Sequence, residues 1–121
     1  MDMYSEKILD YYEHPPNKKK IENADYSATV DNPLCGDQVN VFLKIDGEKI
    51  SQASFDGQGC AISQASASMM LENLEGKTPA EAKSVGETEV LKNLGVTISP
   101  ARMKCAFLGL QALKKALETN K

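Results

Sequence analysis

The residues most able to do chemistry in this 121-residue sequence are its three cysteines and an acid two positions after the first of them: Cys35, Asp37, Cys60 and Cys105. Thiolates bind zinc, iron–sulfur clusters and cuprous copper, whereas a carboxylate ligand weakens the case for copper. No two cysteines form a Cys-x-x-Cys pair, which excludes a zinc ribbon and a thioredoxin-type redox motif. The residue types therefore predict a metal site and leave the metal open.

The surroundings of the cysteines favour metal binding over simple burial. Cys60 and Cys105 fall at predicted helix starts, where free N–H groups and the helix dipole favour the thiolate that binds metal. Gly36 and Gly59 stand next to two of the cysteines and would let the backbone approach a bound cluster closely. Free cysteines are often buried as small apolar residues, so no single cysteine proves a site.

The first elements that must position these residues are a short helix and a hairpin. Apolar residues recur at helical spacing from Tyr4 to about Tyr12, and a proline pair then ends the helix. Alternation over residues 39–45 predicts a strand with one buried face, Asp46-Gly47 predicts a turn, and residues 49–55 predict the returning strand. Residues 29–31 predict a third strand, and the polar residues 17–28 predict a loop.

Helices follow in the second half of the chain. An amphipathic helix is predicted from Cys60 to near Gly76, and Thr78-Pro79-Ala80-Glu81 has the pattern of a capped helix start. Ser99-Pro100 predicts the start of a long C-terminal helix that carries Cys105. We therefore expect one α+β domain over residues 1–121: a small three-stranded antiparallel sheet, packed on one face by several helices, with the metal site at one end.

Composition and charge narrow the class of protein. A net charge of -3 argues against a general nucleic-acid binder. The basic run Lys18 to Lys20 fits a solvated loop, or else a docking patch for an acidic partner. The sequence contains no apolar stretch long enough to span a membrane, and its first 20 residues are too polar for a signal peptide. We expect a cytoplasmic protein with reduced thiols.

Several motifs resemble one known family in the same order along nearly the whole chain. The matching segments are Asp10-Tyr11-Tyr12-Glu13-His14-Pro15 with Asn17, Asn32-Pro33 with Cys35-Gly36-Asp37, Gly59-Cys60-Ala61-Ile62-Ser63, and Lys77-Thr78 with Cys105. They resemble the IscU family of iron–sulfur cluster assembly scaffolds, which also occurs as the N-terminal domain of NifU-type proteins. A lone Cys-Gly-Asp would be weak support, whereas three ligand motifs in family order are specific.

The resemblance implies that Cys35, Cys60 and Cys105 ligate a nascent [2Fe–2S] cluster, with Asp37 completing the shell or making the cluster easier to lose. A carboxylate oxygen is a harder ligand than a thiolate, so such a site should hold a cluster less firmly than four cysteines. The resemblance further implies a cysteine desulfurase as sulfur donor, an electron donor such as a ferredoxin, and apo iron–sulfur proteins as acceptors. The protein would be a carrier and not an enzyme. Cys105 is the expected persulfide acceptor, because Lys104 and Arg102 should favour its thiolate.

Two departures from the family pattern matter. Many members carry histidine where this chain has Lys104, which should stay protonated and balance the charge of a cluster instead of ligating it. Residues 98–102, Ile-Ser-Pro-Ala-Arg, replace the Leu-Pro-Pro-Val-Lys of relatives that use a dedicated Hsp70-type chaperone, which argues against dependence on that chaperone.

Two alternatives remain open. The same residues could hold zinc while one cysteine takes sulfur from a desulfurase, since apo-scaffolds of the family also bind zinc. Lysine before the third cysteine resembles the SufU branch, although this chain lacks the insertion of that branch and is closer to IscU. A thiol enzyme lacks a base near any cysteine in sequence, and the lone His14 fits a surface or packing role. The sequence does not determine whether the protein is a monomer or a homodimer, or whether the final cluster is [2Fe–2S] or [4Fe–4S].

Overall fold

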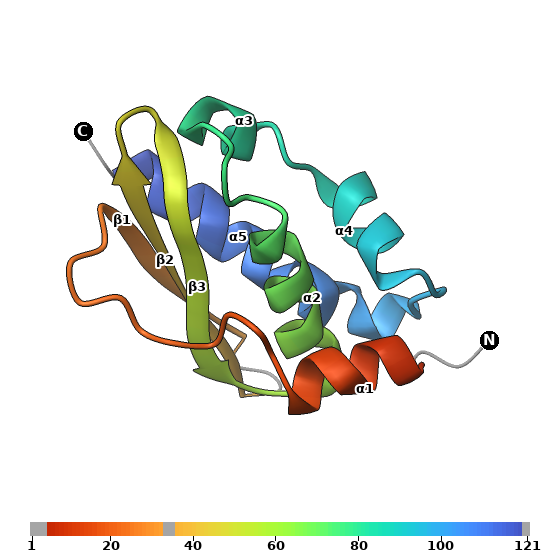
Figure 1. The fold of residues 1–121 in the computed structure, drawn as a ribbon. Helices are drawn as coiled ribbons and strands as arrows, with labels where there is room; N and C mark the ends of the chain where they lie inside the picture. Colours follow the sequence, from red (N-terminus) through yellow and green to blue (C-terminus); the bar gives the residue numbers. More distant parts are fainter. Residues whose placement is uncertain (1–4, 33–35, 120–121) are drawn as a thin grey trace.

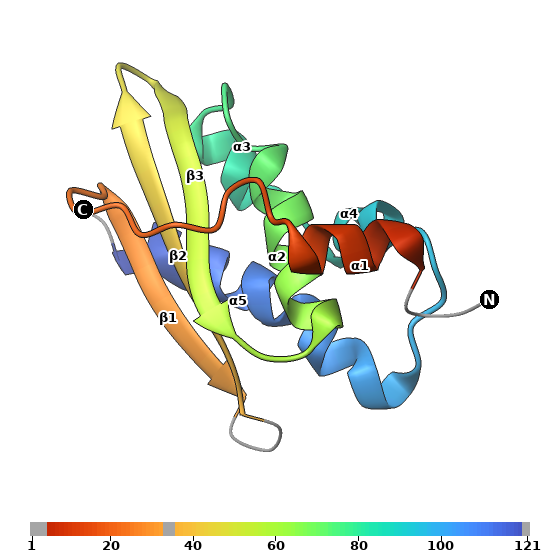
Figure 2. The same ribbon diagram turned by 60° about the horizontal axis from the view of Figure 1, so that its bottom comes forward.

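A three-stranded antiparallel sheet supports a layer of helices on one face (Figures 1 and 2). The structure, a computed structural model, describes residues 5–32 and 36–119. Its elements in chain order are α1 (Glu6–Glu13), β1 (Tyr26–Asn32), β2 (Asp37–Asp46), β3 (Lys49–Gln58), α2 (Ala61–Glu72), α3 (Pro79–Lys83), α4 (Glu87–Leu94), a 3₁₀ turn η1 (Pro100–Arg102) and α5 (Met103–Thr119). The predicted α+β architecture is confirmed.

The sheet is built around β2, which pairs antiparallel with both β1 and β3. Val39, Val41 and Leu43 are fully buried while the residues between them are partly exposed, so the predicted alternation holds. The hairpin turn lies one residue later than predicted, at Gly47-Glu48, and Gly47 has a φ of +67°, which glycine adopts without strain. Alternation thus fixed which face of β2 is buried.

The other two strands are longer than the sequence suggested. β1 starts at Tyr26 and ends at Asn32, so the loop predicted over residues 17–28 is wrong for its last three residues. β3 continues to Gln58, three residues past the predicted end. Pairing with the central strand extends both beyond the residues whose own pattern indicates a strand.

Helix α2 is the centre of the helical layer and not the amphipathic helix that we expected. Residues 61–71 of this helix are all buried, because α1, α4, α5 and the sheet pack around it (Figure 1). The helix ends at Glu72, about a turn before the predicted end near Gly76. α5 crosses α2 closely, since a β-carbon on Gly109 would lie 2.9 Å from that of Ala67.

The two short helices differ in how their first residues are capped. α3 has the predicted capping box: the Glu81 N–H donates to the Thr78 hydroxyl, and the Thr78 N–H donates to the Glu81 carboxylate. α4 was not predicted, because Gly86 offers no side-chain cap and the helix spans only eight residues. Gly95 ends α4 in the left-handed conformation.

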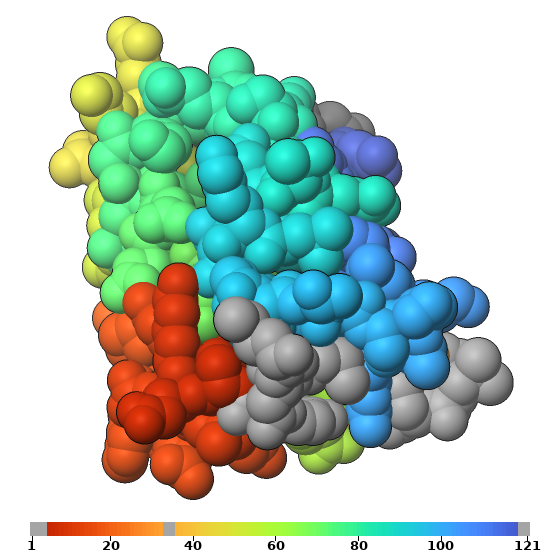
Figure 3. All heavy atoms as spheres, turned by 90° about the vertical axis from the view of Figure 1, so that its right-hand side faces the viewer, coloured from red at the N-terminus to blue at the C-terminus, as the bar shows by residue number. Residues whose placement is uncertain are grey.

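The buried Ile8 side chain and the Asn17 side chain hold the N-terminal segment against the core. The Asn17 side-chain amide donates to the Ser68 carbonyl at 3.0 Å and accepts from the Ser68 hydroxyl at 2.6 Å. The Phe55 N–H donates to the Asn17 carbonyl at 3.1 Å, and Lys18 bridges to Phe55 along the edge of β3. Figure 3 shows the face where α1 meets the helical layer. The Lys7 ammonium of α1 donates to the Asn93 carbonyl of α4 at 2.7 Å.

The C-terminal helix covers β1 and β2. The cap predicted at Ser99-Pro100 begins η1 instead of an α-helix, and α5 follows at Met103, so Cys105 lies in its first turn as expected. Near the far end of α5, the Lys115 ammonium donates to the Thr29 carbonyl of β1 at 3.3 Å. Among the described ranges, no helix is both long and apolar enough to cross a membrane.

Candidate metal centre

Three of the four predicted ligands meet at one end of the sheet. Asp37 is the first residue of β2, Cys60 is the N-cap of α2, and Cys105 lies in the first turn of α5. One ligand atom from each residue lies within 4.8 Å of those of the other two. Cys35 lies outside the described residues. The predicted convergence is therefore observed for Asp37, Cys60 and Cys105.

The Asp37 carboxylate links β2 to the start of α2. It is 2% exposed, and its Oδ1 accepts the Cys60 N–H at 3.0 Å. Its Oδ2 lies 3.6 Å from the Cys60 sulfur, which donates to it. Cys60 itself provides no side-chain cap to α2. One oxygen of Asp37 is thus engaged by the backbone, and the other faces the thiols.

The two glycines that the sequence analysis singled out have different surroundings. Gly36 has a φ of +73° and open space where a β-carbon would lie. Gly59 has a φ of +147°, and a β-carbon there would collide with the Asp37 carboxylate. The close approach that requires glycine at position 59 is therefore made by a side chain of this protein.

Burial is the main influence on the pKa of the Cys105 thiol. It is 2% exposed, and this burial raises the pKa of the Cys105 thiol well above its ordinary value. The neighbouring Asp37 carboxylate and Cys60 thiol raise the same pKa further. The direction is opposite to the one expected from the adjacent Lys104 and Arg102. Coordination to a cation would reverse it, because a metal-bound thiol is deprotonated.

Lys104 and His14 are exposed. Lys104 lines a groove of about 250 Å³ at the end of β1, together with Asp31, Asn32, Leu108 and Gln111. His14 lies at the end of α1 and is not grouped with the thiols. Neither side chain is placed as a ligand within the described part of the chain.

Sequence reasoning missed a buried polar side chain beside the centre. Gln64, one turn after Cys60, is 3% exposed and donates to the Gln38 carbonyl at 3.4 Å and to Ser63 Oγ at 3.2 Å. Among the described residues, its Oε1 has no hydrogen-bond partner. Ser63 in turn donates to the Cys60 carbonyl at 3.1 Å. Polar residues on a helix that is buried on all sides would indicate such a site, but this burial is known only from the packing.

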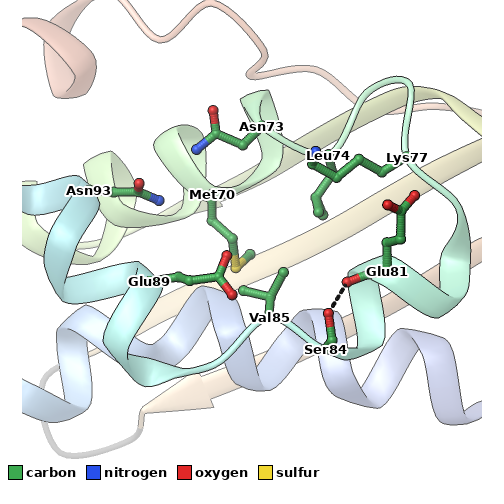
Figure 4. A pocket seen from close by; sticks show the side chains of 9 residues that line it. All are labelled: Met70, Asn73, Leu74, Lys77, Glu81, Ser84, Val85, Glu89 and Asn93. Atoms are coloured by element: carbon green, nitrogen blue, oxygen red, sulfur yellow. Dashed lines mark hydrogen bonds between the residues drawn. The ribbon is translucent and has the colours of Figure 1, made fainter.

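A second hollow of about 240 Å³ lies away from the thiols, between the end of α2 and helices α3 and α4 (Figure 4). The Ser84 hydroxyl donates to the Glu81 carbonyl at its rim. The side chains around it are Met70, Asn73, Leu74, Lys77, Glu81, Ser84, Val85, Glu89 and Asn93. These described residues include neither cysteine nor histidine.

The chain is similar to known proteins along nearly its whole length. Residues 3–121 match the family model described as NifU-like N terminal domain. The iron-sulfur cluster assembly scaffold protein IscU 1 of Archaeoglobus fulgidus is 37% identical over 115 residues, covering 95% of this chain and 74% of that protein. IscU of Escherichia coli K12 is 34% identical over 122 residues, covering 98% and 94%. The zinc-dependent sulfurtransferase SufU of Bacillus subtilis is 36% identical over 134 aligned residues, covering 95% and 93%.

Solved structures share the fold. The crystal structure of a putative iron-sulfur cluster assembly scaffold protein for the SUF system from Fervidobacterium islandicum AW-1 superposes with a TM-score of 0.80 at 36% identity, covering 95% of this chain and 96% of that one. The N-terminal NifU-like protein of Brucella abortus superposes with a TM-score of 0.76 at 24% identity, covering 96% and 92%. The second likeness concerns the fold alone.

Proposed function

Because this chain belongs to the family of NifU-like N-terminal domains, we propose that it is a scaffold on which an iron–sulfur cluster is assembled and from which the cluster passes to acceptor proteins. The observation that carries the proposal is the meeting of Asp37, Cys60 and Cys105 within 4.8 Å at the end of the sheet. Thiolates are the usual ligands of iron–sulfur clusters. The relatives named IscU support the same function.

The proposed ligand set is Cys35, Cys60, Cys105 and Asp37, and the proposed cargo is a [2Fe–2S] cluster. Cys35 belongs to the connection between β1 and β2, and the residues that flank this connection, Asn32 and Asp37, are paired across the two strands. The Gly36 N–H donates to the Asn32 carbonyl at 2.9 Å. The connection therefore leaves and re-enters the sheet beside the other ligands, which supports Cys35 as the fourth member.

Asp37 is the proposed source of lability. A carboxylate oxygen binds iron less covalently than a thiolate, so an incoming acceptor thiol displaces it more easily. A scaffold must release what it builds, and a site with one exchangeable ligand provides a place for transfer to begin.

Sulfur delivery is proposed to occur on Cys105. In this step the Cys105 thiolate attacks the outer sulfur of the desulfurase persulfide, a new S–S bond forms, and the desulfurase cysteine leaves as a thiolate. Because Cys105 is buried, the start of α5 must open for the donor to reach its sulfur, and a bound cation would favour the thiolate that attacks. Mass spectrometry after incubation with a cysteine desulfurase locates the persulfide. Its appearance on Cys35 or Cys60 alone would contradict this assignment.

The partners proposed for this cycle are a cysteine desulfurase, an electron donor such as a ferredoxin, and apo iron–sulfur acceptors. We propose a cytoplasmic carrier, not an enzyme, that does not depend on a dedicated Hsp70-type chaperone. Neither nucleic acid nor a membrane has a role in the cycle. Whether the working form is a homodimer is read from its mass in solution with and without cluster.

The test of the scaffold function is anaerobic reconstitution with ferrous iron, cysteine and a desulfurase, followed by absorbance and Mössbauer spectra. We expect a cluster that moves to an apo-ferredoxin and is absent from Cys35→Ser. Ser51→Ala, an exposed change in β3 away from the thiols, serves as the control. Protein that holds zinc tightly and forms no cluster would contradict the proposal.

A zinc-bound sulfur acceptor is the second candidate, because the Bacillus subtilis relative is named a zinc-dependent sulfurtransferase. Three thiolates and one carboxylate also suit a four-coordinate zinc site. Acid-labile sulfide in protein purified without air separates the two functions, since only a cluster contains it.

A further inference from the structure

The Asp37 carboxylate occupies space that a side chain at position 59 would fill. A β-carbon built on Gly59 lies 2.4 Å from Asp37 Oδ1, 2.7 Å from its Cγ and 3.0 Å from its Cα. Contacts below 3.0 Å are sterically forbidden, so a larger residue at position 59 must displace Asp37 or the start of β2. The glycine and the aspartate therefore fit together as a pair.

The same short segment also binds the carboxylate. Residue 60 follows the glycine directly, and its N–H donates to Asp37 Oδ1 at 3.0 Å. Gly59 thus leaves room for the Asp37 carboxylate, and the Cys60 N–H donates a hydrogen bond to it. Oδ2 remains directed at the Cys60 sulfur, at 3.6 Å.

We propose that Gly59 is a positioning residue for the metal centre: its bare Cα seats the Asp37 carboxylate so that Oδ1 bonds the Cys60 N–H and Oδ2 alone faces the cation. Asp37 then acts as a monodentate ligand in a fixed orientation. Hydrogen bonds to a ligating carboxylate commonly set both its orientation and the affinity of the site. This inference rests on the metal site of the proposed function and adds a residue that is not itself a ligand.

Two other glycines separate this role from general backbone effects. Gly95, at the end of α4, has a φ of +71° but has nothing within 4 Å of a built β-carbon. Gly57 has a φ of +148°, much like Gly59, but its β-carbon would meet the Gln38 carbonyl oxygen at 2.1 Å. Gly95→Ala therefore tests backbone strain alone, and Gly57→Ala tests a strand collision that does not involve the carboxylate.

The experiment measures Co²⁺ binding to the reduced protein, by competition with a chelator and by optical spectra. The variants are Gly59→Ala, Asp37→Ala and the double variant, with Gly95→Ala and Gly57→Ala as controls. We expect Gly59→Ala to weaken Co²⁺ binding by about 10- to 100-fold. Its ligand-field bands should match those of Asp37→Ala, while the sulfur-to-cobalt charge-transfer bands persist. Gly95→Ala and Gly57→Ala, where folded, should keep the ligand-field bands of the parent.

The double variant provides the decisive comparison. If Gly59 acts through Asp37, the double variant binds Co²⁺ no more weakly than Asp37→Ala alone. Parent-like binding by Gly59→Ala, losses that multiply in the double variant, or loss of the charge-transfer bands would each overturn the proposal. Cobalt binding as expected without cluster assembly would instead contradict the scaffold function and leave the positioning role intact.

Gly59→Ala can also fail at the level of folding, which thermal unfolding detects. In that case Asp37→Gly is combined with it, because this change removes the colliding carboxylate. Recovery of a cooperative transition in the pair supports the proposal. No recovery shows that position 59 needs glycine for its own backbone, and this result overturns it.

Discussion

At the scale of single residues, the proposed centre brings the Cys60 and Cys105 thiols together with a carboxylate whose two oxygens have different partners. Asp37 Oδ1 bonds the Cys60 N–H, and Oδ2 faces the thiols. Affinity for a single cation and the rate of cluster release are different quantities. Asp37 Oδ2 can raise the affinity for a single cation and also be the exchangeable ligand at which cluster release begins.

Asp37→Ala should therefore slow the loss of a reconstituted cluster to an acceptor. We expect about a tenfold slower transfer, which corresponds to about 1.4 kcal/mol of activation free energy. The measurement is the rate of cluster appearance in an apo-ferredoxin by circular dichroism. Asp46→Ala, at the other end of β2, is the control and should transfer at the parent rate. A parent-like rate in Asp37→Ala would rule out the carboxylate as the labile ligand.

Lys104 is expected to balance the negative charge of a cluster bound by thiolates. It is exposed on the turn of α5 that carries Cys105. Lys104→Ala should therefore shorten the lifetime of the cluster about two- to fivefold, which corresponds to roughly 0.4–1 kcal/mol of activation free energy. Absorbance decay under anaerobic conditions measures it. Lys104→Arg keeps the charge and should behave like the parent. Equal lifetimes in all three proteins would remove the role.

At the scale of elements, the N-terminal segment depends on Asn17. Asn17→Ala removes both side-chain hydrogen bonds to Ser68 and leaves buried polar atoms without them. We expect the free energy of unfolding to fall by about 1–3 kcal/mol in urea denaturation. Lys20→Ala, exposed in the same loop, should leave it unchanged. An unaffected Asn17→Ala would show that the segment is held mainly by other contacts.

The start of α3 should respond to acid through Glu81. Its hydrogen bond from the Thr78 N–H lowers the pKa of the Glu81 carboxyl below the ordinary value of 4.5. A carboxyl whose pKa is lower in the folded state contributes stability above its unfolded pKa and loses it as the pH falls through the folded pKa. Stability at this helix should therefore decline below about pH 4.5.

Glu81→Gln keeps a side-chain acceptor at every pH, so its unfolding free energy should fall less steeply below that pH than that of the parent. Chemical denaturation across a pH series compares the two. Glu118→Gln, an exposed change on α5, controls for net charge. Identical slopes in all three proteins would show that the cap does not couple to acid.

How far the sequence predicts the structure depends on whether a feature is local. The alternation of β2 and the capping box at Thr78 are local patterns, and both were correct. The burial of α2 is not local, because helices from both ends of the described chain surround its serines and alanines. α4 was missed because its boundaries are glycines without a side-chain cap.

The same distinction applies to the centre. Cysteine motifs indicated which residues would meet, and the structure brings Asp37, Cys60 and Cys105 together. The acidity of Cys105 was misjudged because neighbours in sequence, Lys104 and Arg102, were given more weight than burial, which only the packing reveals. The contact between Gly59 and Asp37 was also out of reach, since it depends on how the start of β2 meets the segment before α2.

At the scale of the whole molecule, the centre joins β2, α2 and α5, so an ion bound there should stabilise the entire fold. With free Zn²⁺ at about 100 times its Kd, we expect about 2.7 kcal/mol of added stability, or roughly 10 °C in Tm. Thermal unfolding of reduced protein with and without Zn²⁺ measures this rise. Cys105→Ser should lose most of it. A parent Tm that does not respond to Zn²⁺ would show that the three elements are not joined by the ion.

Both edge strands of the sheet, β1 and β3, have contacts that limit pairing with further strands. The backbone of Asn17 and Lys18 runs along β3, and the Lys115 ammonium takes up the Thr29 carbonyl on β1. Unpaired strand margins are templates for intermolecular association, and lysine at such margins is a common protection against it. These contacts therefore limit amyloid-like stacking of copies of this chain through the margins of its sheet.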